Sequence, residues 1–441
     1  MAWWDSLAAA APAPVKDLAV TAASSQLLLR RRGGDYRRWR ADHRAWRRQP
    51  RAALLAVQRR RLDELLQFAR DHSPFYRRRL AGLDLADLAR LPVLEKSDLL
   101  ERIDEIVVGD KRRLVASFTG GTTGAAITVY NGWPCFHERA ALMDLFWEMH
   151  GFRVGRARTA WLSGRQLVWD ADVRAVRFWR TNWLYRIRYY STFHMAPEHL
   201  GRYLDDLNRF APAFLTGFPS AIGELARFAE ATGTRLTFRP RAIFVTSETL
   251  LPEQREAMER VFGCPVRNQY AASEGAPFIV ECAEGRLHMD LTTGVFEVQD
   301  DGEVLVTAFA TRETPIIRYR IGDRIRMAPD VPCPCGWDTP LVESIEGRST
   351  EYVEVPGRGR IFCSQIGDCV KGVSTVLRFQ VGMVDGRLAV DMVARQADFE
   401  ARDKATFLAK VAERFGPVPV DIRYVDDIPR SRGGKHSVVR R

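Results

Sequence analysis

The stretch FLTGFPSAIGELARFAEATGTRLTFRPRAIFVTSETLLPEQREAMERVFGCPVRNQY, residues 214–270, alternates short apolar runs with longer segments of helical periodicity. Strands are expected at residues 160–162, 214–216, 242–246 and 266–270, and helices at residues 219–232 and 252–262. Strands that alternate with helices are typical of a mostly parallel sheet with helices on both faces. The sequence therefore predicts an α/β fold.

The rest of the chain changes character along its length. Residues 1–110 are basic and helical in periodicity, and residues 277–327 are nearly all strand-like. A smaller strand-rich unit with one helix at residues 398–415 follows. We expect a large N-terminal domain with mixed, mostly parallel sheets, helices and a strand-rich subdomain, and a small α+β C-terminal domain. The expected segments are 1–110, a helical part of the large domain, 111–347, its core, and 348–441, the C-terminal domain.

The composition predicts a globular protein of two or three domains. The chain has 441 residues, of which 46% are apolar, enough for a sizeable core. A run of about eighteen apolar residues is absent, and residues 1–5 lack the pattern of a secretion signal. We therefore expect a cytoplasmic location.

The formal net charge of +11 arises largely from arginines between Arg30 and Arg61. Apolar residues such as Leu54, Leu62 and Leu66 recur among them at helical spacing. This pattern favours amphipathic helices with solvated arginine faces over a surface for nucleic acid or lipid. We expect neither nucleic acid nor a membrane as a partner.

Residues 117–124, Ser-Phe-Thr-Gly-Gly-Thr-Thr-Gly, lie between two strand-like segments, which predicts a hairpin with glycines at its tip. Glycine backbones approach an anion closely, and free N–H groups with threonine hydroxyls can hold a polyphosphate. A Walker loop would continue with a lysine and a helix, and this segment does not. The alternative is a turn without a ligand.

Lys435 is one of seven lysines in an arginine-rich chain, and it follows Gly433 and Gly434. A single ammonium group on a glycine-flanked, mobile loop can bring positive charge to a phosphate and then withdraw. The alternative is a frayed basic tail, because Arg432 and His436 lie beside it.

Two further loops carry groups suited to a nucleotide. In residues 270–275, Tyr270 could stack on a base, Ser273 could reach a phosphate oxygen and Glu274 could bind Mg²⁺. Residues 318–323 end in Asp323, whose carboxylate could accept hydrogen bonds from both ribose hydroxyls. Each loop by itself also fits a surface turn with solvated charges.

Four of the possible metal ligands cluster by spacing. Cys282 and His288 flank a turn, and Cys333 and Cys335 form a tight Cys-Pro-Cys-Gly segment downstream. A set of three thiolates and one imidazole would give a closed tetrahedral site, which suits structural zinc. Ordinary buried thiols remain the alternative. Seven cysteines without a secretion signal make a disulfide framework unexpected.

Taken together and in this order, these segments resemble the adenylate-forming superfamily of acyl-CoA synthetases and adenylation domains, and particularly its phenylacetate-CoA ligase-like branch. The resemblance extends from about residue 73 to the C-terminal lysine. It implies a phosphate loop at Thr119, Gly120, Gly121, Thr122, Thr123 and Gly124, an adenine and magnesium loop at Tyr270, Ser273 and Glu274, a ribose carboxylate at Asp323, a hinge region with Arg348, and an adenylation lysine at Lys435. It also implies zinc at Cys282, His288, Cys333 and Cys335, and a C-terminal domain that moves as a lid.

The resemblance implies an AMP-forming ligase with ATP, Mg²⁺ and structural Zn²⁺ as cofactors. A carboxylate attacks the α-phosphate of ATP, and a nucleophile, usually the thiol of coenzyme A, then displaces AMP. Lys435 would neutralise charge at the α-phosphate, Glu274 would bind Mg²⁺, and Thr122 would orient the leaving pyrophosphate. The acyl pocket is expected at Trp133, Phe136, His137, Trp147 and Phe218. Their aromatic character favours an aryl or otherwise apolar acid.

The chain departs from the family pattern at three places. Residues 125–126 are Ala-Ala where many relatives carry Lys-Pro, and Ala271 replaces the usual glycine after Tyr270. At the hinge, residues 349–351 replace an acidic pair. These departures leave the acceptor step less defined than the adenylation step.

Three functions are therefore open. An acyl-CoA ligase leads. An adenylating enzyme that transfers its acyl group to an amine, a carrier-protein thiol or a sugar, in natural-product or polysaccharide biosynthesis, is second. A zinc-containing binding protein is third, and the presence of Glu274, Asp323 and Lys435 together argues against it.

Overall fold

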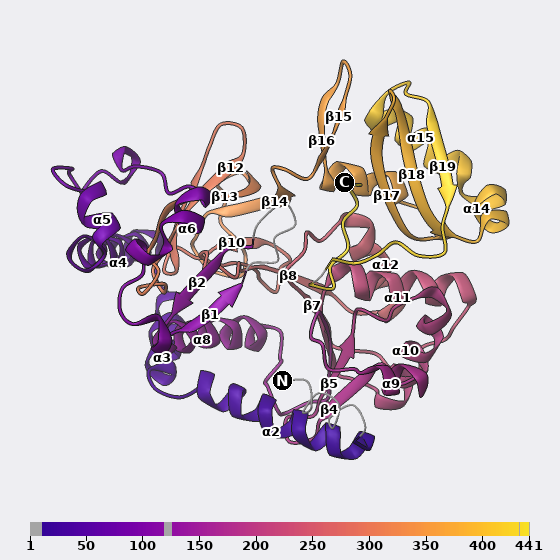
Figure 1. The fold of residues 1–441 in the computed structure, drawn as a ribbon, viewed down its shortest axis with the longest axis horizontal. Coiled ribbons are helices and arrows are strands. Elements are labelled where there is room, and N and C mark those ends of the chain that lie inside the picture. Colours follow the sequence, from indigo (N-terminus) through magenta and orange to yellow (C-terminus); the bar gives the residue numbers. More distant parts are fainter. Residues whose placement is uncertain (1–10, 119–125, 432, 441) are drawn as a thin grey trace. The chain divides into compact units, whose positions relative to one another are not determined.

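The computed structural model describes residues 11–118, 126–431 and 433–440, and the chain divides into two compact units (Figure 1). We call residues 1–26, 152–267 and 346–441 unit 1, and residues 27–151 and 268–345 unit 2. Unit 1 thus combines the C-terminal part of the chain with most of the stretch 214–270. The three-segment division expected from the sequence stays a prediction.

Unit 1 contains a mixed, mostly parallel sheet with the strand order β7-β6-β3-β5-β4. Its strands are β3 (Thr159–Ser163), β4 (Trp179–Asn182), β5 (Ile187–Ser191), β6 (Phe214–Gly217) and β7 (Ala242–Val245). Only β4 runs antiparallel to its neighbour. The predicted α/β fold is therefore confirmed, and the strands at residues 160–162, 214–216 and 242–246 form where the sequence places them.

Helices follow the strands of this sheet. They are α9 (Asp170–Arg174), α10 (Pro197–Phe210), α11 (Pro219–Thr232) and α12 (Pro252–Phe262). Both α11 and α12 begin with proline and end before a glycine, Gly233 or Gly263, with positive φ. These local stop signals explain why their predicted bounds agree with the observed ones. Their apolar faces bury residues such as Ile222 against sheet residues such as Ile243.

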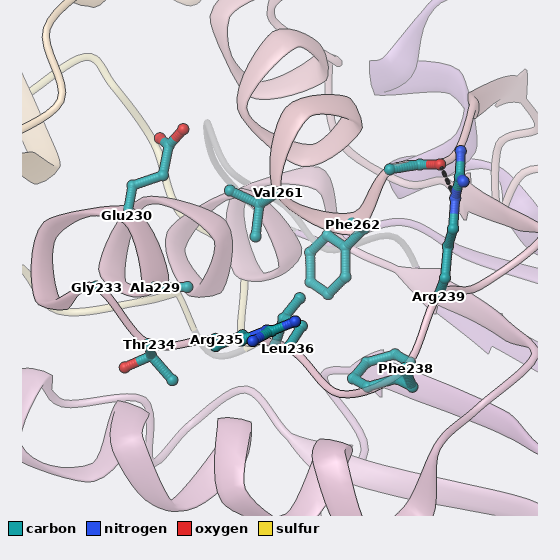
Figure 2. Close-up of a pocket in the computed structure, with 11 residues that line it drawn as sticks. Ala229, Glu230, Gly233, Thr234, Arg235, Leu236, Phe238, Arg239, Val261 and Phe262 are labelled. Carbon is teal, nitrogen blue, oxygen red and sulfur yellow. Dashed lines mark hydrogen bonds between the residues drawn. The ribbon is translucent and has the colours of Figure 1, made fainter.

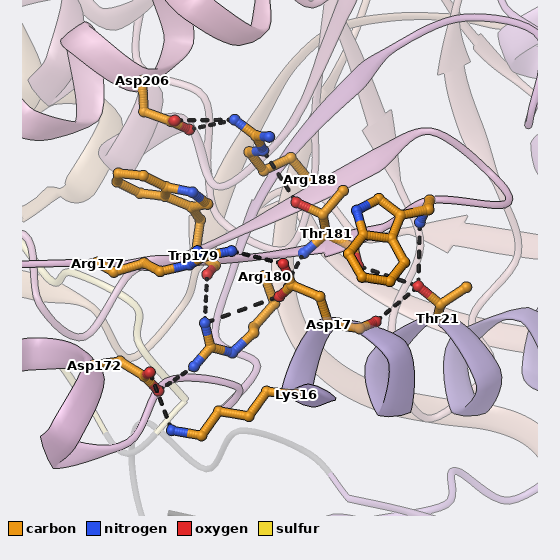
Figure 3. A network of polar contacts seen from close by, with 11 residues as sticks. Lys16, Asp17, Thr21, Asp172, Arg177, Trp179, Arg180, Thr181, Arg188 and Asp206 are labelled. Carbon is orange, nitrogen blue, oxygen red and sulfur yellow. Dashed lines mark hydrogen bonds and ion pairs between the residues drawn. The ribbon is translucent and has the colours of Figure 1, made fainter. Parts of the chain in front are cut away.

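The edge strand β4 is covered by helix α2 (Ala13–Arg31), as Figure 3 shows. Asp17 accepts a hydrogen bond from the Thr181 N–H at 3.3 Å, and the Thr21 hydroxyl donates to the Thr181 carbonyl at 3.3 Å. Next to them, Arg180 is 0% exposed and forms an ion pair with Asp172. The helix therefore satisfies backbone groups that an edge strand leaves open to other chains.

The C-terminal part of unit 1 is a small α+β assembly. It contains β15 (Tyr352–Val355), β16 (Gly359–Phe362), α13 (Cys363–Gly367), β17 (Val376–Val384), β18 (Arg387–Ala394), α14 (Gln396–Arg402), α15 (Lys404–Phe415) and β19 (Val420–Tyr424). The single helix predicted at 398–415 is wrong, because α14 and α15 are separated at Asp403. The Asp403 carboxylate accepts hydrogen bonds from the N–H groups of Ser374 and Thr375, both at 2.8 Å. This contact holds residue 403 outside helical geometry, with φ of −122°.

Unit 2 combines basic helices with antiparallel strands. Its helices are α3 (Tyr36–Trp46), α4 (Arg51–His72), α5 (Pro74–Arg79), α6 (Lys96–Glu101), α7 (Ile103–Ile106) and α8 (Trp133–Met149). Its strands are β1 (Val115–Phe118), β2 (Thr128–Asn131), β9 (Ile279–Glu281), β10 (Leu287–Met289), β11 (Gly294–Val298), β12 (Glu303–Ala308) and β13 (Ile316–Met327). Three boundaries with unit 1 fall inside an element, namely α2, β8 (Val266–Tyr270) and β14 (Leu341–Arg348). Helix α4 buries its predicted apolar face against these strands.

The expectation of solvated arginine faces is wrong at Arg61. This side chain is buried and donates two hydrogen bonds, of 2.6 and 2.9 Å, to the buried carboxylate of Glu138 on α8. Burial raises the pKa of Glu138, but Arg61 and His43 outweigh it and lower that pKa to about 2. The pair therefore stays ionised and joins two helices that are distant in the sequence. Within the described residues, no helix is both long and apolar enough to cross a bilayer.

Candidate functional site

The predicted phosphate loop itself, Thr119, Gly120, Gly121, Thr122, Thr123 and Gly124, lies outside the described residues. The strands on either side of it form the expected hairpin. β1 and β2 pair antiparallel, from Val115 opposite Asn131 to Phe118 opposite Thr128. The roles of the loop residues stay predictions.

In unit 2 the fold brings together two of the predicted nucleotide-binding side chains. Tyr270 ends β8 and Asp323 lies on β13, and the Tyr270 hydroxyl donates a hydrogen bond to Asp323 Oδ2 at 2.6 Å. Asp323 is buried, and so is Glu274, which is 3% exposed, whereas Ser273 is exposed. A buried carboxylate next to an aromatic ring is an arrangement that can bind a nucleoside.

The loop after β8 is held in one shape by close packing at Gly275. This residue has φ of +97°, and a Cβ added there would lie 2.1 Å from Thr311 Cγ2. The Arg139 guanidinium donates to the Ala272 carbonyl at 2.9 Å. Only glycine fits at position 275, so the loop that carries Glu274 is fixed from both sides.

The four predicted metal ligands also meet in unit 2. The ligand atoms of Cys282, His288, Cys333 and Cys335 all lie within 4.8 Å of one another. The Cys282 and Cys333 sulfurs are 3.8 Å apart, and Cys335 Sγ lies 3.4 Å from His288 Nε2. Thiolates at about 2.3 Å from one tetrahedral zinc ion would be about 3.8 Å apart. The residues present therefore fit zinc.

The surroundings of His288 prepare its ring for a metal. Its Nδ1 lies 2.9 Å from the Thr339 hydroxyl, which orients the ring so that Nε2 faces the sulfurs. Trp337 stacks on the same ring with centroids 5.0 Å apart. Burial lowers the pKa of His288 to about 4, so the imidazole is neutral, the form that coordinates metal.

Lys435 lies in unit 1, on a tight turn that starts at Ser431. The Ser431 N–H donates to the Lys435 carbonyl at 2.8 Å, and the Gly434 N–H donates to the Ser431 carbonyl at 2.8 Å. A Cβ on Gly434 would lie 2.4 Å from Thr192 Oγ1, and one on Gly164 would lie 1.9 Å from the Gly433 carbonyl oxygen. The turn therefore packs backbone against backbone at the end of β3, and the alternative of a frayed tail does not describe it.

Sequence reasoning missed one carboxylate beside this turn. Glu248 follows β7, and its carboxylate accepts hydrogen bonds from the N–H groups of Ser220 and His436, both at 3.1 Å. Burial raises the pKa of Glu248, and the charges of Arg430 and Lys435 act in the opposite direction. The position of Glu248 directly after a predicted strand is the same signal that identified residues 270–275.

The remaining predicted residues are Arg348 and those of the acyl pocket, and they lie in both units. Arg348 ends β14 in unit 1. In unit 2, the Trp133 ring lies 3.8 Å from the Arg30 guanidinium, and Gly34 packs on His137. Phe136 and Trp147 lie on α8 with Trp133, and Phe218 precedes α11 in unit 1. Trp147 and Phe218 are buried. The assignments of Arg348 and of the substrate pocket stay predictions.

A separate open pocket of about 700 Å³ lies at the C-terminal ends of α11 and α12 (Figure 2). Its lining includes Glu230, Arg235, Phe238 and Phe262. None of the predicted site residues contributes to it, and we assign it no role.

We predict that Gly434→Ala loosens the lysine turn, because the added methyl group would overlap Thr192. Trypsin should then cleave at Arg430 or Lys435 several-fold faster, since cleavage requires the segment to open. Gly386→Ala is the matched control, because Gly386 has a similar φ of +75° but nothing within 4 Å of its added Cβ. Equal cleavage rates in the two variants would show that the packing at Thr192 does not hold the turn.

No protein-family model matches the sequence. CapK from Staphylococcus aureus is 31% identical over 401 residues, which cover 87% of this chain and 88% of CapK. Indoleacetate-lysine synthetase from Pseudomonas savastanoi is 21% identical over 237 residues, which cover 53% of this chain and 58% of that enzyme.

Among solved structures, 2-hydroxyisobutyryl-CoA ligase in its postadenylation state superimposes with a TM-score of 0.67 at 20% sequence identity, over 89% of this chain and 90% of the ligase. The same ligase in its thioesterification state, with 2-HIB-AMP and CoA, gives a TM-score of 0.55 at 20% identity, again over 89% and 90%. These structures establish the fold, and the identity with CapK extends over most of both chains. The chain therefore belongs to the same family as CapK, and it has the fold of 2-hydroxyisobutyryl-CoA ligase.

Proposed function

We propose that this chain uses ATP and Mg²⁺ to activate an aryl or otherwise apolar carboxylic acid as an acyl-adenylate, and then transfers the acyl group to coenzyme A. The observation that carries the proposal is the fold match over 89% of the chain to a ligase whose complexes hold an acyl-adenylate and CoA. The proximity of Tyr270 and Asp323, and the ordered Lys435 turn, support it.

In this proposal the chain accelerates adenylation by positioning and charge neutralisation rather than by covalent chemistry. Tyr270 binds the adenine, Asp323 accepts from the ribose hydroxyls and Glu274 binds Mg²⁺. Lys435 offsets the negative charge that gathers between the attacking carboxylate and the α-phosphate. Thr119, Thr122 and Thr123 orient the leaving pyrophosphate, and Arg348 belongs to the hinge region.

A second candidate function differs in the acceptor. Indoleacetate-lysine synthetase, by its name, joins an aromatic acid to an amine, and it matches 53% of this chain. An amine or a carrier-protein thiol in natural-product or polysaccharide biosynthesis would then replace coenzyme A. Both functions share the adenylation step.

The test is a panel of acids that includes indoleacetate, phenylacetate, benzoate and 2-hydroxyisobutyrate. We expect at least one aryl or apolar acid to give ATP- and Mg²⁺-dependent hydroxamate with hydroxylamine, together with AMP and pyrophosphate. Thioester formation with coenzyme A would support the first function, and amide formation with lysine the second. Formation of ADP, or no nucleotide turnover with any acid and no ATP binding, would contradict both.

We predict that Lys435→Ala reduces ATP-pyrophosphate exchange by about two to three powers of ten, because one preorganised charge is lost. The variant should still transfer the acyl group from a supplied acyl-adenylate. Lys404→Ala, which removes an exposed lysine of the same C-terminal part, should leave exchange unchanged. Exchange near the parent's rate in Lys435→Ala would refute the assigned role.

We also propose that Cys282, His288, Cys333 and Cys335 bind one zinc ion that stabilises unit 2. All four positions of a tetrahedral site would be filled by protein atoms, so the metal would supply folding free energy and no open position for a substrate. This donor set suits zinc better than magnesium.

Cys333→Ser is expected to reduce the zinc content to well below one per chain and to lower the melting temperature. Cys264→Ser is the control, because Cys264 is a buried thiol outside the cluster and should change stability without loss of metal. Elemental analysis and thermal melts measure both effects. A metal-free parent protein that is as stable as the zinc-loaded form would reject the site.

A further inference from the structure

Helix α11 carries a carboxylate that the adenylation mechanism does not use. The Glu224 side chain is 0% exposed, although an isolated buried carboxylate is strongly unfavourable. Its two oxygens face two arginines: Arg378 Nε lies 2.8 Å from Oε1, and Arg430 forms an ion pair with Oε2. Both arginines are themselves almost completely buried.

Both arginines come from the C-terminal part of the chain. Arg378 lies on β17, and it also donates to the Ile428 carbonyl at 2.9 Å and to Asp427 at 2.6 Å. It therefore holds the segment that leads to the lysine turn. Arg430 lies in that segment, and its guanidinium also reaches the Ser220 hydroxyl at 3.3 Å.

Lys435 is thus anchored on both sides. On one side, Arg430 directly precedes Ser431, where the tight turn begins. On the other side, the His436 N–H donates to Glu248 at 3.1 Å. Glu248 in turn accepts from the Ser220 N–H at the start of α11, so both anchors converge on the same end of that helix.

We propose that Glu224 is a positioning residue that acts through Arg430 and Arg378 to place the Lys435 ammonium for adenylation, and that Glu248 is the second anchor of the same turn. The kinetic consequence of this inference rests on the proposed function. The anchoring of the Lys435 turn rests only on contacts within unit 1. A displacement of a reacting group by about 1 Å can cost about a hundredfold in rate.

The ion pair also affects the second half-reaction. The resemblance to the adenylate-forming superfamily implies a C-terminal domain that moves as a lid, and such a movement before acyl transfer would separate Arg430 and Arg378 from Glu224. Separation of buried, paired charges is costly, which favours the state that carries out adenylation. Loss of the Glu224 charge should therefore slow adenylation and leave acyl transfer unchanged or faster. A role in folding alone would reduce both half-reactions in proportion to the loss of folded protein.

The experiment compares Glu224→Gln with Glu230→Gln. Glu230 lies on the same helix but pairs with exposed Arg260, away from the C-terminal segment. We expect ATP-pyrophosphate exchange to fall about tenfold to a hundredfold in Glu224→Gln, with transfer from a supplied acyl-adenylate within about threefold of the parent or faster. Glu230→Gln should match the parent in both assays. A parallel decrease of both half-reactions in Glu224→Gln would overturn the proposal.

Arg430→Gln removes the partner charge in the C-terminal segment. It tests the same ion pair if Glu224→Gln fails to fold. The double variant Glu224→Gln/Arg430→Gln should lose less exchange activity than the product of the two single losses, because both changes break one interaction. Independent losses that multiply would contradict the coupling.

A second readout does not depend on catalysis. Amide hydrogen exchange of residues 433–440 should be at least several-fold faster in Glu224→Gln than in Glu230→Gln. If no acid supports adenylation by the parent protein, the proposed function fails, and this measurement still decides whether Glu224 holds the segment. Equal exchange in the two variants would reject the anchor itself.

Discussion

Pairing of buried opposite charges joins segments of this chain that are far apart in the sequence. Lys16 of helix α2 pairs with Asp172, Arg61 pairs with Glu138 in unit 2, and Glu224 pairs with two arginines of the C-terminal part. Removal of one member of such a pair typically costs about 3–5 kcal/mol, because the partner charge stays buried. An arginine-rich chain therefore uses part of its charge in its interior, and the net charge alone does not describe its surface.

Much of the fold could be predicted because its signals are local. Proline at the start and glycine after the end fixed the bounds of α11 and α12, and short apolar runs identified β3, β6 and β7. The errors arose where a distant residue decides the outcome. Asp403 interrupts a helix because it binds the turn before β17, and Arg61 is buried because Glu138 neutralises it. Neither partner is visible in the local pattern.

The residues of the candidate site also separate into those that a local motif predicts and those that depend on distant packing. The proposed zinc ligands, and Tyr270 and Asp323, belong to motifs whose residue types indicate their chemistry, and the fold brings each set together. Glu248 follows strand β7, as residues 271–275 follow strand β8, so the same sequence signal could have predicted it. Glu224 could not, since a glutamate in a helical pattern normally indicates a solvated face. Its contacts depend on how the C-terminal segment packs within unit 1.

Because helix α2 covers strand β4, it also limits association of the chain with copies of itself. Asp17 and Thr21 occupy the Thr181 N–H and carbonyl, the same groups that another strand would use to extend the sheet. A chain shortened to begin after Gln26 would lose both residues and Lys16, and β4 would become an open template for intermolecular pairing. Loss of most of helix α2 would then cause aggregation that increases with protein concentration, even where the remaining sheet stays folded.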